Sequence, residues 1–330
     1  MAYKVTIIGG SGFIGTRLCR QLQLQDINFE IIDLKMSNQY PGECKIADVR
    51  DIESLLETIT GDIVVNLAAV HRDDVRDKSE YRRTNVIGTE NIALVCTAKR
   101  IKKIVFTSTV AVYGLAKSDN NKDCQPQPTN EYGKTKLRAE EILRRWQSDS
   151  VENSLIIIRP TVIFGEGNRG NVFNLINQIA IGRFLMIGSG NNKKSMAYVG
   201  NVAAFLEACI LSDIKYGIYD YIDTPDLTMN ELVSYVRQII LGKSGPGIKL
   251  PYIFGIFVGY LADLVSRLTG KKLPVSSIRI KKFIATTQYK STKENLCGFE
   301  PPFQLLEGLE RTLQSEYLSP KSDHEIFYTE

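Results

Sequence analysis

Apolar runs of strand length recur along the first two thirds of the chain, with helical stretches between them. These runs are "KVTIIGG" at 4–10, "FEIIDL" at 29–34, "DIVVNLAA" at 62–69, "KKIVFTST" at 102–109, "LIIIRPTVIFG" at 155–165 and "GIYDYI" at 217–222. Strands that alternate with helices predict parallel βαβ units, and near-continuous Val and Ile content indicates strands covered on both faces. We therefore predict an α/β fold built on a doubly wound parallel sheet.

The alternation loosens after Gly165, which predicts a second, smaller lobe. The stretches "NVFNLINQIAIGRF" and "TMNELVSYVRQII" read as helices outside the first sheet. We expect residues 1–165 and 198–224 to form the first domain. Residues 166–197 and 225–330 are expected to form a discontinuous α/β substrate-binding lobe.

Composition and charge narrow the class of protein. The 330 residues are 43% hydrophobic and 24% charged, which is typical of a globular chain with a large core. The net charge of +4 is too small to indicate nucleic-acid binding. Six scattered cysteines without a CxxC pair favour reduced thiols, and with only two histidines we predict no metal. The strand-like N-terminus shows no signal peptide, so we expect a cytoplasmic protein.

The stretch "IIGGSGFIGTRL" is the first chemical signal, because it follows a predicted strand and opens a predicted helix. Gly9, Gly12 and Gly15 have the spacing of a dinucleotide-binding loop, in which missing Cβ atoms let backbone N–H groups approach a pyrophosphate. A plain glycine turn is the alternative.

An acidic residue at the end of the second predicted strand supports the dinucleotide interpretation. Asp33 lies about 20 residues after the loop, where a carboxylate binds the adenosine ribose. Such a carboxylate repels a 2′-phosphate and so favours NAD over NADP. Asp48, in "ADVRD", is expected near the adenine, although it could equally be a helix cap.

The stretch "YGKTK" places Tyr132 and Lys136 four residues apart, on one face of a helix. An ammonium beside a phenol stabilises the phenolate, so we expect a lowered tyrosine pKa and a base that works near neutral pH. The strand run "VFTSTVAVYG" ends in three hydroxyl residues, Thr107, Ser108 and Thr109. A hydroxyl there can hold the sugar oxygen that exchanges its proton with Tyr132.

Together these motifs resemble the extended short-chain dehydrogenases/reductases, specifically the NAD-dependent nucleotide-sugar epimerase/dehydratase group. The resemblance covers nearly the whole chain and implies a Rossmann domain at 1–165 and 198–224. It implies a catalytic triad of Thr109, Tyr132 as base and Lys136, with Asn85 supporting the site. It also implies NAD contacts from Gly9, Gly12, Phe13, Ile14, Gly15, Asp33, Asp48, Val49, Leu67, Ala68, Ala69, Thr107, Tyr132, Lys136 and Pro160.

The residues after Thr109 favour one reaction within the group. Sugar dehydratases of the group carry an Asp-Glu pair there, whereas this chain has Val110 and Ala111. Epimerisation at C4 through a 4-keto sugar therefore fits best. The alternatives are a C4 ketoreductase and, in a different class, a non-enzymatic NAD-binding module.

A narrower resemblance concerns the substrate. The runs "HRDDV", "RPTVIFGEGNRGNVFNL", "KSMAYVGN" and "VSSIRIKKFIATTQY" look like those of bacterial epimerases that interconvert N-acetylglucosamine and N-acetylgalactosamine on undecaprenyl diphosphate during O-antigen, and hence lipopolysaccharide, assembly. Lys194 stands where soluble relatives usually carry a diphosphate-binding arginine. A soluble epimerase of UDP-N-acetylglucosamine or UDP-glucose is the alternative. Candidate substrate-binding residues are His71, Ser108, Thr109, Asn171, Lys194 and Thr287.

The segment 252–282 joins an apolar stretch to a basic one. Gly255, Gly259, Asp263 and Arg267 fall four apart on one stripe, which leaves most of a helix circumference apolar, and Asp263 interrupts the run too early for a comfortable membrane span. Between residues 264 and 293 there are eight basic residues and no acid. These are Arg267, Lys271, Lys272, Arg279, Lys281, Lys282, Lys290 and Lys293.

An apolar helix beside an acid-free basic stretch is typical of a helix that lies in an anionic membrane interface. We therefore expect peripheral association with the inner face of the cytoplasmic membrane. A core helix of the smaller lobe is the alternative. The oligomeric state is left open, with a homodimer as one option.

Overall fold

A seven-stranded parallel sheet forms the centre of the larger part of the chain. The computed structural model describes residues 3–72, 75–114, 125–270, 276–293, 296, 298–320 and 325–328. The strand order is β10-β6-β5-β4-β1-β2-β3, and every neighbouring pair is parallel. The strands are β1 (Lys4–Ile8), β2 (Asn28–Asp33), β3 (Cys44–Ile46), β4 (Ile63–Asn66), β5 (Lys103–Thr107), β6 (Ser154–Pro160) and β10 (Tyr216–Tyr221). The predicted α/β class is thus confirmed, and only the short β3 was not anticipated.

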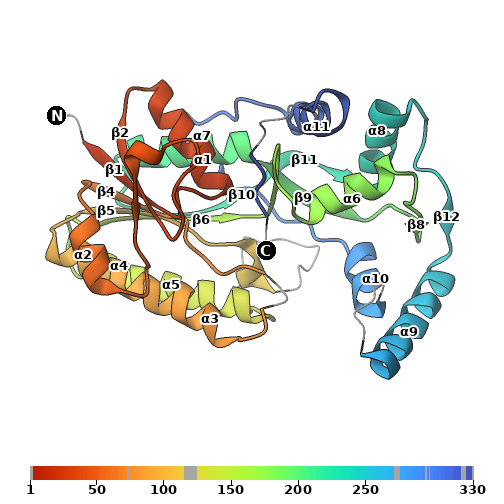
Figure 1. The fold of residues 1–330 in the computed structure, drawn as a ribbon, viewed down its shortest axis with the longest axis horizontal. Coiled ribbons are helices and arrows are strands. Elements are labelled where there is room, and N and C mark those ends of the chain that lie inside the picture. Colours follow the sequence, from red (N-terminus) through yellow and green to blue (C-terminus); the bar gives the residue numbers. More distant parts are fainter. Residues whose placement is uncertain are drawn as a thin grey trace.

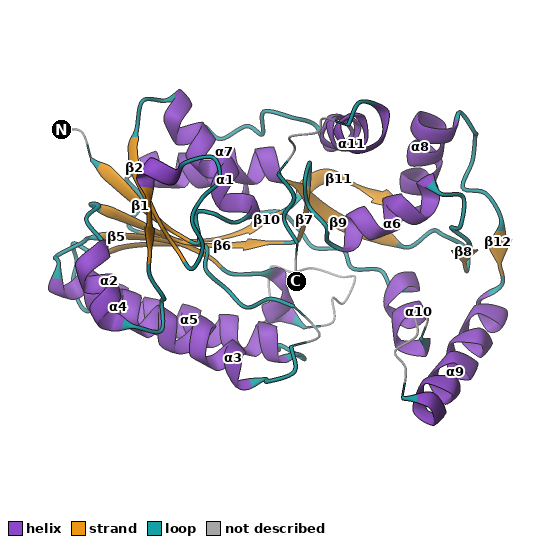
Figure 2. Cartoon of the chain, viewed as in Figure 1, coloured by secondary structure: helices purple, strands orange, loops and turns teal. Residues whose placement is uncertain are grey.

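Helices cover both faces of this sheet, as Figure 1 and Figure 2 show. One face carries α1 (Phe13–Leu24) and α7 (Val199–Leu211), which pack on each other. The other carries α2 (Ile52–Thr58), α4 (Gly88–Ala98) and α5 (Glu131–Ser148), with the short α3 (Ser79–Tyr81) and a π-helical turn, Arg82–Ile87, leading into α4. Each face buries its own apolar cluster, so the Val and Ile runs are covered on both sides as expected.

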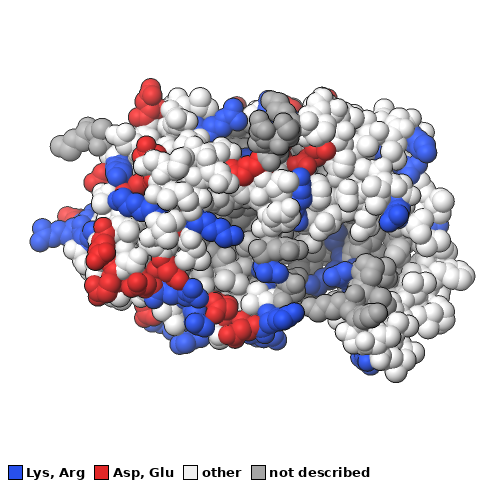
Figure 3. All heavy atoms as spheres, in the orientation of Figure 1, with Lys and Arg blue, Asp and Glu red and all other residues white. Residues whose placement is uncertain are grey.

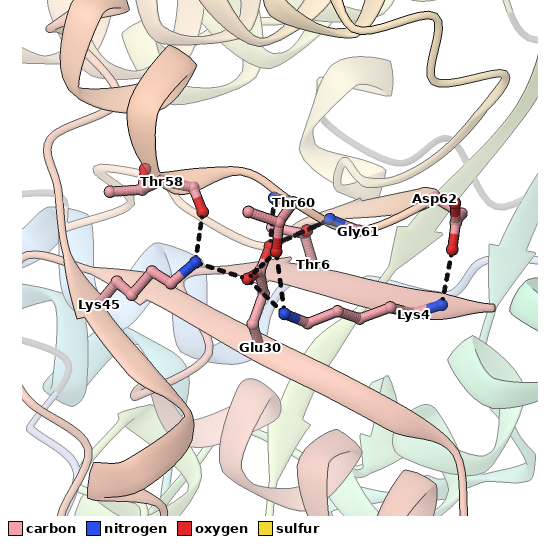
Figure 4. Close-up of polar contacts among 8 residues, drawn as sticks. All are labelled: Lys4, Thr6, Glu30, Lys45, Thr58, Thr60, Gly61 and Asp62. Carbon is pink, nitrogen blue, oxygen red and sulfur yellow. Dashed lines mark hydrogen bonds and ion pairs between the residues drawn. The ribbon is translucent and has the colours of Figure 1, made fainter. Parts of the chain in front are cut away.

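A buried carboxylate on β2 ties three strands together (Figure 4). Glu30 is 2% exposed and accepts hydrogen bonds from Thr6 Oγ1 at 2.7 Å and Thr60 N at 2.6 Å. The ammonium groups of Lys4 on β1 and Lys45 on β3 each lie 2.9 Å from its Oε2 atom. Burial by itself raises the pKa of Glu30, but the hydrogen bonds from Thr60, Lys4 and Thr6 outweigh it and lower that pKa to about 2.

A second, smaller set of elements lies beside the carboxyl ends of the large sheet. It contains a three-stranded sheet in the order β11 (Asp223–Thr228), β9 (Lys193–Tyr198) and β7 (Val162–Phe164), and a two-stranded sheet of β12 (Lys249–Leu250) and β8 (Met186–Ile187). The helices α6 (Asn171–Ala180), α8 (Met229–Leu241) and α11 (Leu305–Leu313) contribute to a third apolar cluster. Both predicted helices are present, as α6 and α8. The domain boundaries remain a prediction, and β7 lies on the first-domain side of residue 165 while pairing with β9.

Two helices project from this smaller region, α9 (Tyr252–Thr269) and α10 (Ser277–Ile284) (Figure 1). Only Gly255 and Gly259 of α9 are buried. A Cβ on Gly255 would lie 2.4 Å from the Ile187 side chain, and one on Gly259 would lie 2.9 Å from the Ser277 backbone. The glycines therefore let α9 approach β8 and α10 closely. The alternative of a core helix is wrong, because most of the α9 circumference is exposed.

Four cysteines, Cys19, Cys44, Cys96 and Cys209, are buried free thiols, as the sequence predicts. Cys124, Cys297, His324, Lys271 and Lys272 lie outside the described residues.

Candidate active site

The first turn of α5 carries Tyr132 and packs against the loop that follows β5. Asn130 caps α5 by accepting a 2.8 Å hydrogen bond from Gly133 N. A Cβ on Gly133 would lie 2.5 Å from the carbonyl oxygen of Ala111, so only glycine allows this close approach. The packing brings the phenol of Tyr132 close enough to Thr109 for the Thr109 side chain to influence the pKa of Tyr132.

Thr109 is held in place by the turn that it starts. It caps the 3₁₀ helix Val110–Tyr113, and its Oγ1 atom accepts a 3.1 Å hydrogen bond from Ala111 N. Its side chain is 8% exposed. The predicted catalytic hydroxyl is therefore fixed beside the predicted base.

The electrostatics of Tyr132 differ from our expectation. Burial raises the pKa of Tyr132 to about 12, and the neighbouring Thr109 side chain lowers it only in part. The pKa of Lys136 is itself lowered to about 7 by burial, with the nearby carboxylate of Glu140 acting in the opposite direction. The expected lowering of the Tyr132 pKa by Lys136 is thus wrong for the protein alone, because desolvation of the phenol dominates.

Lys136 is 1% exposed and its ammonium lies 4.2 Å from the centre of the Phe106 ring. One helical turn further along α5 stands Glu140, which is fully buried. Glu140 Oε1 accepts a 2.6 Å hydrogen bond from the hydroxyl of Ser108, the residue before Thr109. Glu140 therefore acts electrostatically on Lys136 and binds the residue that precedes Thr109.

Arg159, which precedes Pro160, pairs with the same carboxylate. Its Nε and Nη2 atoms lie 2.8 and 2.6 Å from the two oxygens of Glu140, and its Nη1 donates to the hydroxyl of Tyr113 at 2.6 Å. Sequence analysis did not identify Glu140. Its position four residues after Lys136, on the buried face of the same helix, was the available signal.

The glycine loop forms a cradle that side chains would fill. Gly9 has φ +84°, and a Cβ there would lie 2.8 Å from Ala68 N. A Cβ on Gly15 would lie 2.5 Å from the Cα of Gly10. Asp33 accepts a 3.0 Å hydrogen bond from Ser11 N, so the end of β2 is joined to the loop. Burial raises the pKa of Asp33 above its usual value, although these backbone hydrogen bonds oppose the shift.

The other predicted cofactor residues lie at or just after the carboxyl ends of β1, β3, β4, β5 and β6. The hydroxyl of Thr107 is buried and has no hydrogen-bond partner among the described residues, which fits a polar group of a bound dinucleotide. Asp48 is not a helix cap, because Asp51 caps α2 and Asp48 binds Arg50 instead. The remaining predicted contacts are Gly12, Phe13, Ile14, Val49, Leu67, Ala69 and Pro160.

Asn85 joins two walls of the site. Its Oδ1 accepts from Val70 N at 2.8 Å, and its Nδ2 donates to the carbonyl of Val70 at 2.9 Å. The same Nδ2 lies 3.1 Å from the hydroxyl of Thr135, which is next to Lys136. The asparagine thus fixes the segment after β4 against α5.

The candidate substrate residues fall into separate groups. His71 lines a pocket of about 310 Å³, and its pKa is lowered first by desolvation and then by the charges of Lys136 and Arg72. The Ser108 hydroxyl donates to Glu140, so a substrate could only donate to it. Asn171 is exposed at the start of α6.

Lys194 and Thr287 lie opposite each other at the edge of β9. The Lys194 ammonium donates to the carbonyl oxygens of Lys282 and Ala285, at 2.9 and 2.6 Å, and burial lowers the pKa of Lys194 to about 8. Lys194 therefore binds the C-terminal end of α10. The Thr287 backbone pairs with Lys193 and Ser195, at 3.0 Å each, and extends the small sheet by one residue.

Comparisons with known proteins agree with this geometry. A profile of the NAD dependent epimerase/dehydratase family matches residues 5–219. The sequence is 48% identical over 330 residues to the N-acetyl-alpha-D-glucosaminyl-diphospho-ditrans,octacis-undecaprenol 4-epimerase of Escherichia coli O157:H7, with 99% of each chain covered. It is 28% identical to the UDP-glucose 4-epimerase of Vibrio cholerae, with 96% of each chain covered.

Solved structures support the fold. The UDP-N-acetylglucosamine 4-epimerase from Bacillus cereus superposes with a TM-score of 0.73 at 20% identity, over 94% of this chain and 98% of that chain. The structure titled MoeE5 in complex with UDP-glucose and NAD gives a TM-score of 0.71 at 23% identity, over 94% and 97% of the two chains. The predicted Rossmann fold is confirmed.

Proposed function

Because the chain belongs to the NAD dependent epimerase/dehydratase family, we propose that it is a 4-epimerase that interconverts N-acetylglucosamine and N-acetylgalactosamine on undecaprenyl diphosphate. Family membership confirms the predicted NAD cofactor. Identity of 48% along the full length to a lipid-linked sugar 4-epimerase supports the substrate. The observation that carries the reaction type is the proximity of the Tyr132 phenol to the helix-capping Thr109 side chain, beside the buried Lys136.

We assign the chemistry to these three side chains. Tyr132 accepts the proton of the C4 hydroxyl and later returns it to the 4-keto sugar, while Thr109 orients that oxygen. Bound at the glycine loop, oxidised NAD would supply an acceptor for the hydride of C4 and a donor for its return. Lys136, in its protonated form, favours the phenolate of Tyr132.

The fit of NAD to the chain rests on the glycine cradle, the Thr107 hydroxyl and Asp33. The cradle accommodates a pyrophosphate against backbone N–H groups, and Asp33 at the end of β2 is placed to accept from the adenosine ribose. Gly12, Phe13, Ile14 and the strand-end residues complete the proposed contacts.

The experiment that tests the function is direct. Purified protein is incubated separately with undecaprenyl-diphosphate-linked and UDP-linked N-acetylglucosamine, without added reductant, and the released sugars are analysed. We expect N-acetylgalactosamine from the lipid-linked substrate. Conversion of the UDP-linked sugar alone would support the soluble epimerase instead, and a net requirement for NADH would support a ketoreductase.

The proposal includes a membrane surface for α9 and α10. The exposed side chains of α9 include Ile253 at 75%, Phe254 at 64%, Phe257 at 59% and Leu268 at 78%. Figure 1 shows α9 projecting from the smaller region, and in the same orientation Figure 3 shows almost no charged side chains there on the visible face. Exposed apolar area of this kind marks an interaction surface, and a lipid interface suits an enzyme whose substrate carries a polyprenyl chain.

Basic residues border this apolar surface. Lys281 and Lys282 are exposed in the last turn of α10, and the ammonium of Lys281 lies 3.2 Å from the Tyr260 hydroxyl. They complement anionic headgroups beside the apolar helix. Lys293, which the sequence places in the same basic stretch, is 4% exposed and pairs with Asp223 at 3.6 Å, so it does not belong to this surface.

α9 lies along the interface in this proposal. By length and composition alone, this 18-residue helix is long and apolar enough to cross a membrane, contrary to our expectation from Asp263. However, Asp263 accepts a 2.5 Å hydrogen bond from the Ser277 hydroxyl, and the glycine stripe packs on β8 and α10. A span would break these contacts, whereas interfacial binding preserves them.

Lys194 and Thr287 are proposed to contact the substrate near this surface. Lys194 lies at the junction of β9 and α10, where a diphosphate could exchange for the helix carbonyls. Thr287 is proposed to border the C2 substituent, with a side chain small enough to admit an N-acetyl group.

A further inference from the structure

The last described segment of the chain, Glu325–Tyr328, crosses between parts of the fold that are far apart in the sequence. Phe327 forms a parallel bridge with Asn168. Its N–H donates to the carbonyl of Gly167 at 2.8 Å, and its carbonyl accepts from Arg169 N at 3.0 Å. The segment is therefore held by backbone hydrogen bonds to the loop that follows β7.

The side chain of Phe327 extends to the glycine loop. It is 8% exposed, its ring centroid lies 5.7 Å from that of Phe13, and the guanidinium of Arg17 lies 5.1 Å from its centre. Arg17 also contacts the Phe13 ring at 5.4 Å and donates to the Glu166 carbonyl at 2.6 Å. The first turn of α1 is thus clamped between the C-terminal segment and the loop after β7.

The other end of the segment reaches the loop after β2. The two carboxylate oxygens of Glu325 accept hydrogen bonds from the side-chain amides of Asn38 and Gln39, each at 2.9 Å. This loop begins directly after Asp33, the last residue of β2. Gly167 has φ +80°, and a Cβ there would lie 2.3 Å from the Glu325 carbonyl oxygen, so a glycine allows the segment to pass this closely.

These contacts lead to one inference, which rests on the proposed function because it concerns bound NAD. We propose that Glu325–Tyr328 is a cofactor-retaining strap that joins the loop after β2, the glycine loop and the loop after β7 across the dinucleotide groove. The first two loops hold the adenosine ribose and pyrophosphate in the proposed site. NAD dissociation then requires the strap to open first, and a 4-epimerase gains from this because it regenerates its oxidised cofactor in every turnover.

The test measures cofactor exchange and not catalysis. Purified full-length protein is loaded with radiolabelled NAD, desalted and chased with excess unlabelled NAD, and the half-time of label loss is recorded. Phe327→Ala removes the aromatic contact with Phe13 and the cation–π contact with Arg17. We expect its exchange to be about tenfold faster than that of the wild-type protein.

Two further variants make the result decisive. Tyr328→Ala is the matched control, because Tyr328 is an aromatic residue of the same segment and is 67% exposed. Its exchange should equal that of the wild type. Glu325→Ala removes the two amide hydrogen bonds and the electrostatic attraction to Arg17, and leaves the Phe327 ring in place. It should accelerate exchange by a smaller factor, so it decides the question if Phe327→Ala fails to fold.

Several results would overturn the strap. Unchanged exchange in a folded Phe327→Ala protein would do so, as would equal acceleration in Tyr328→Ala. A wild-type protein that neither retains nor binds labelled NAD would instead overturn the proposed function itself, so the two failures are distinguishable.

Discussion

Two effects act on the pKa of Tyr132: desolvation raises it, the neighbouring Thr109 side chain lowers it, and desolvation dominates. Tyr132→Phe keeps the ring that packs in the site but removes the proton acceptor. We expect retained NAD and an epimerisation rate reduced by at least about 10²-fold, the usual contribution of a general base. Sugar analysis and the NAD content of the desalted protein are the measurements. Near-normal turnover would remove Tyr132 from the mechanism.

Lys136 is a buried amine whose pKa is lowered to about 7 from 10.5. Between these values the unfolded chain binds a proton that the folded protein does not, so burial of Lys136 costs more stability as the pH falls from 10.5 to 7. Lys136→Met should therefore melt at a higher temperature than the wild type at pH 7. The difference should shrink towards pH 9.5, by at most about 1.4 kcal/mol per pH unit.

The same variant should have lost epimerisation at every pH, because methionine has no amine that can carry a proton beside Tyr132. Thermal melting across pH 7–9.5 and a sugar assay separate the two effects. A stability difference that does not change with pH would show that Lys136 is protonated in the folded protein throughout this range.

Asp33 determines cofactor preference in the proposed site. Asp33→Asn keeps the shape of the side chain but removes the charge that repels a 2′-phosphate. We expect weaker NAD binding and reduced discrimination against NADP, measured by titration with each cofactor. Unchanged preference between the two cofactors would place the ribose-binding acid elsewhere.

At the scale of elements, packing within the fold does not account for the exposed apolar side chains of α9. A stripe of two glycines binds it to β8 and α10, and its large apolar side chains face outward. The proposal that these side chains lie in a membrane interface makes a prediction about binding and about substrate length.

Phe254 and Phe257 supply a large part of the exposed apolar area of α9. Changing both to Ser should release the protein from anionic vesicles and impair activity on the undecaprenyl-linked substrate. Activity on a short, water-soluble analogue should change little, because the proposed catalytic residues lie in another part of the fold. Wild-type binding should weaken in high salt, since screening acts over about 10 Å at 0.1 M.

Leu24 and Val151 provide the matched control for this experiment. They are 69% and 93% exposed and do not belong to α9, so changing both to Ser should leave vesicle binding intact. Equal loss of both activities in the α9 variant, or a lower melting temperature, would show that α9 stabilises the fold. Dimer dissociation on substitution, in a protein that never bound vesicles, would indicate that a second copy covers α9.

At the scale of the whole molecule, the network around Glu30 connects the first three strands of the large sheet, away from the site. Its pKa is lowered to about 2 from 4.5, so it contributes stability above pH 4.5 that is lost as the pH falls towards 2. Glu30→Gln should lower stability at pH 7 by on the order of 2–3 kcal/mol. The difference from the wild type should shrink in melting curves recorded between pH 4.5 and 2.5. A constant difference over this range would mean that hydrogen-bond geometry, and not ionisation, gives Glu30 its effect.

The sequence by itself determined the large sheet, the glycine loop, Asp33 and the Thr109, Tyr132 and Lys136 set. These features depend on local causes: Val and Ile runs of strand length, glycines where a Cβ would collide, and the fixed spacing of residues four apart on a helix. The same local reasoning identified the glycine stripe of α9, because a helix repeats its face every three to four residues.

Only the tertiary structure decided what depends on distant residues. Desolvation of Tyr132 and Lys136 comes from elements packed around α5, so the direction of the tyrosine pKa could not be read from the Y-x-x-x-K spacing. Glu140 gains its role by meeting Ser108 and Arg159, which lie on two other strands. Lys293 does not belong to the basic surface because it pairs with Asp223, 70 positions earlier in the chain. Phe327 packs against Phe13 beside the glycine loop, although the two residues lie near opposite ends of the chain. The ionisation, solvent exposure and contacts of such residues depend on the side chains that surround them in the folded protein. Residues far apart in the sequence become neighbours only when the chain folds.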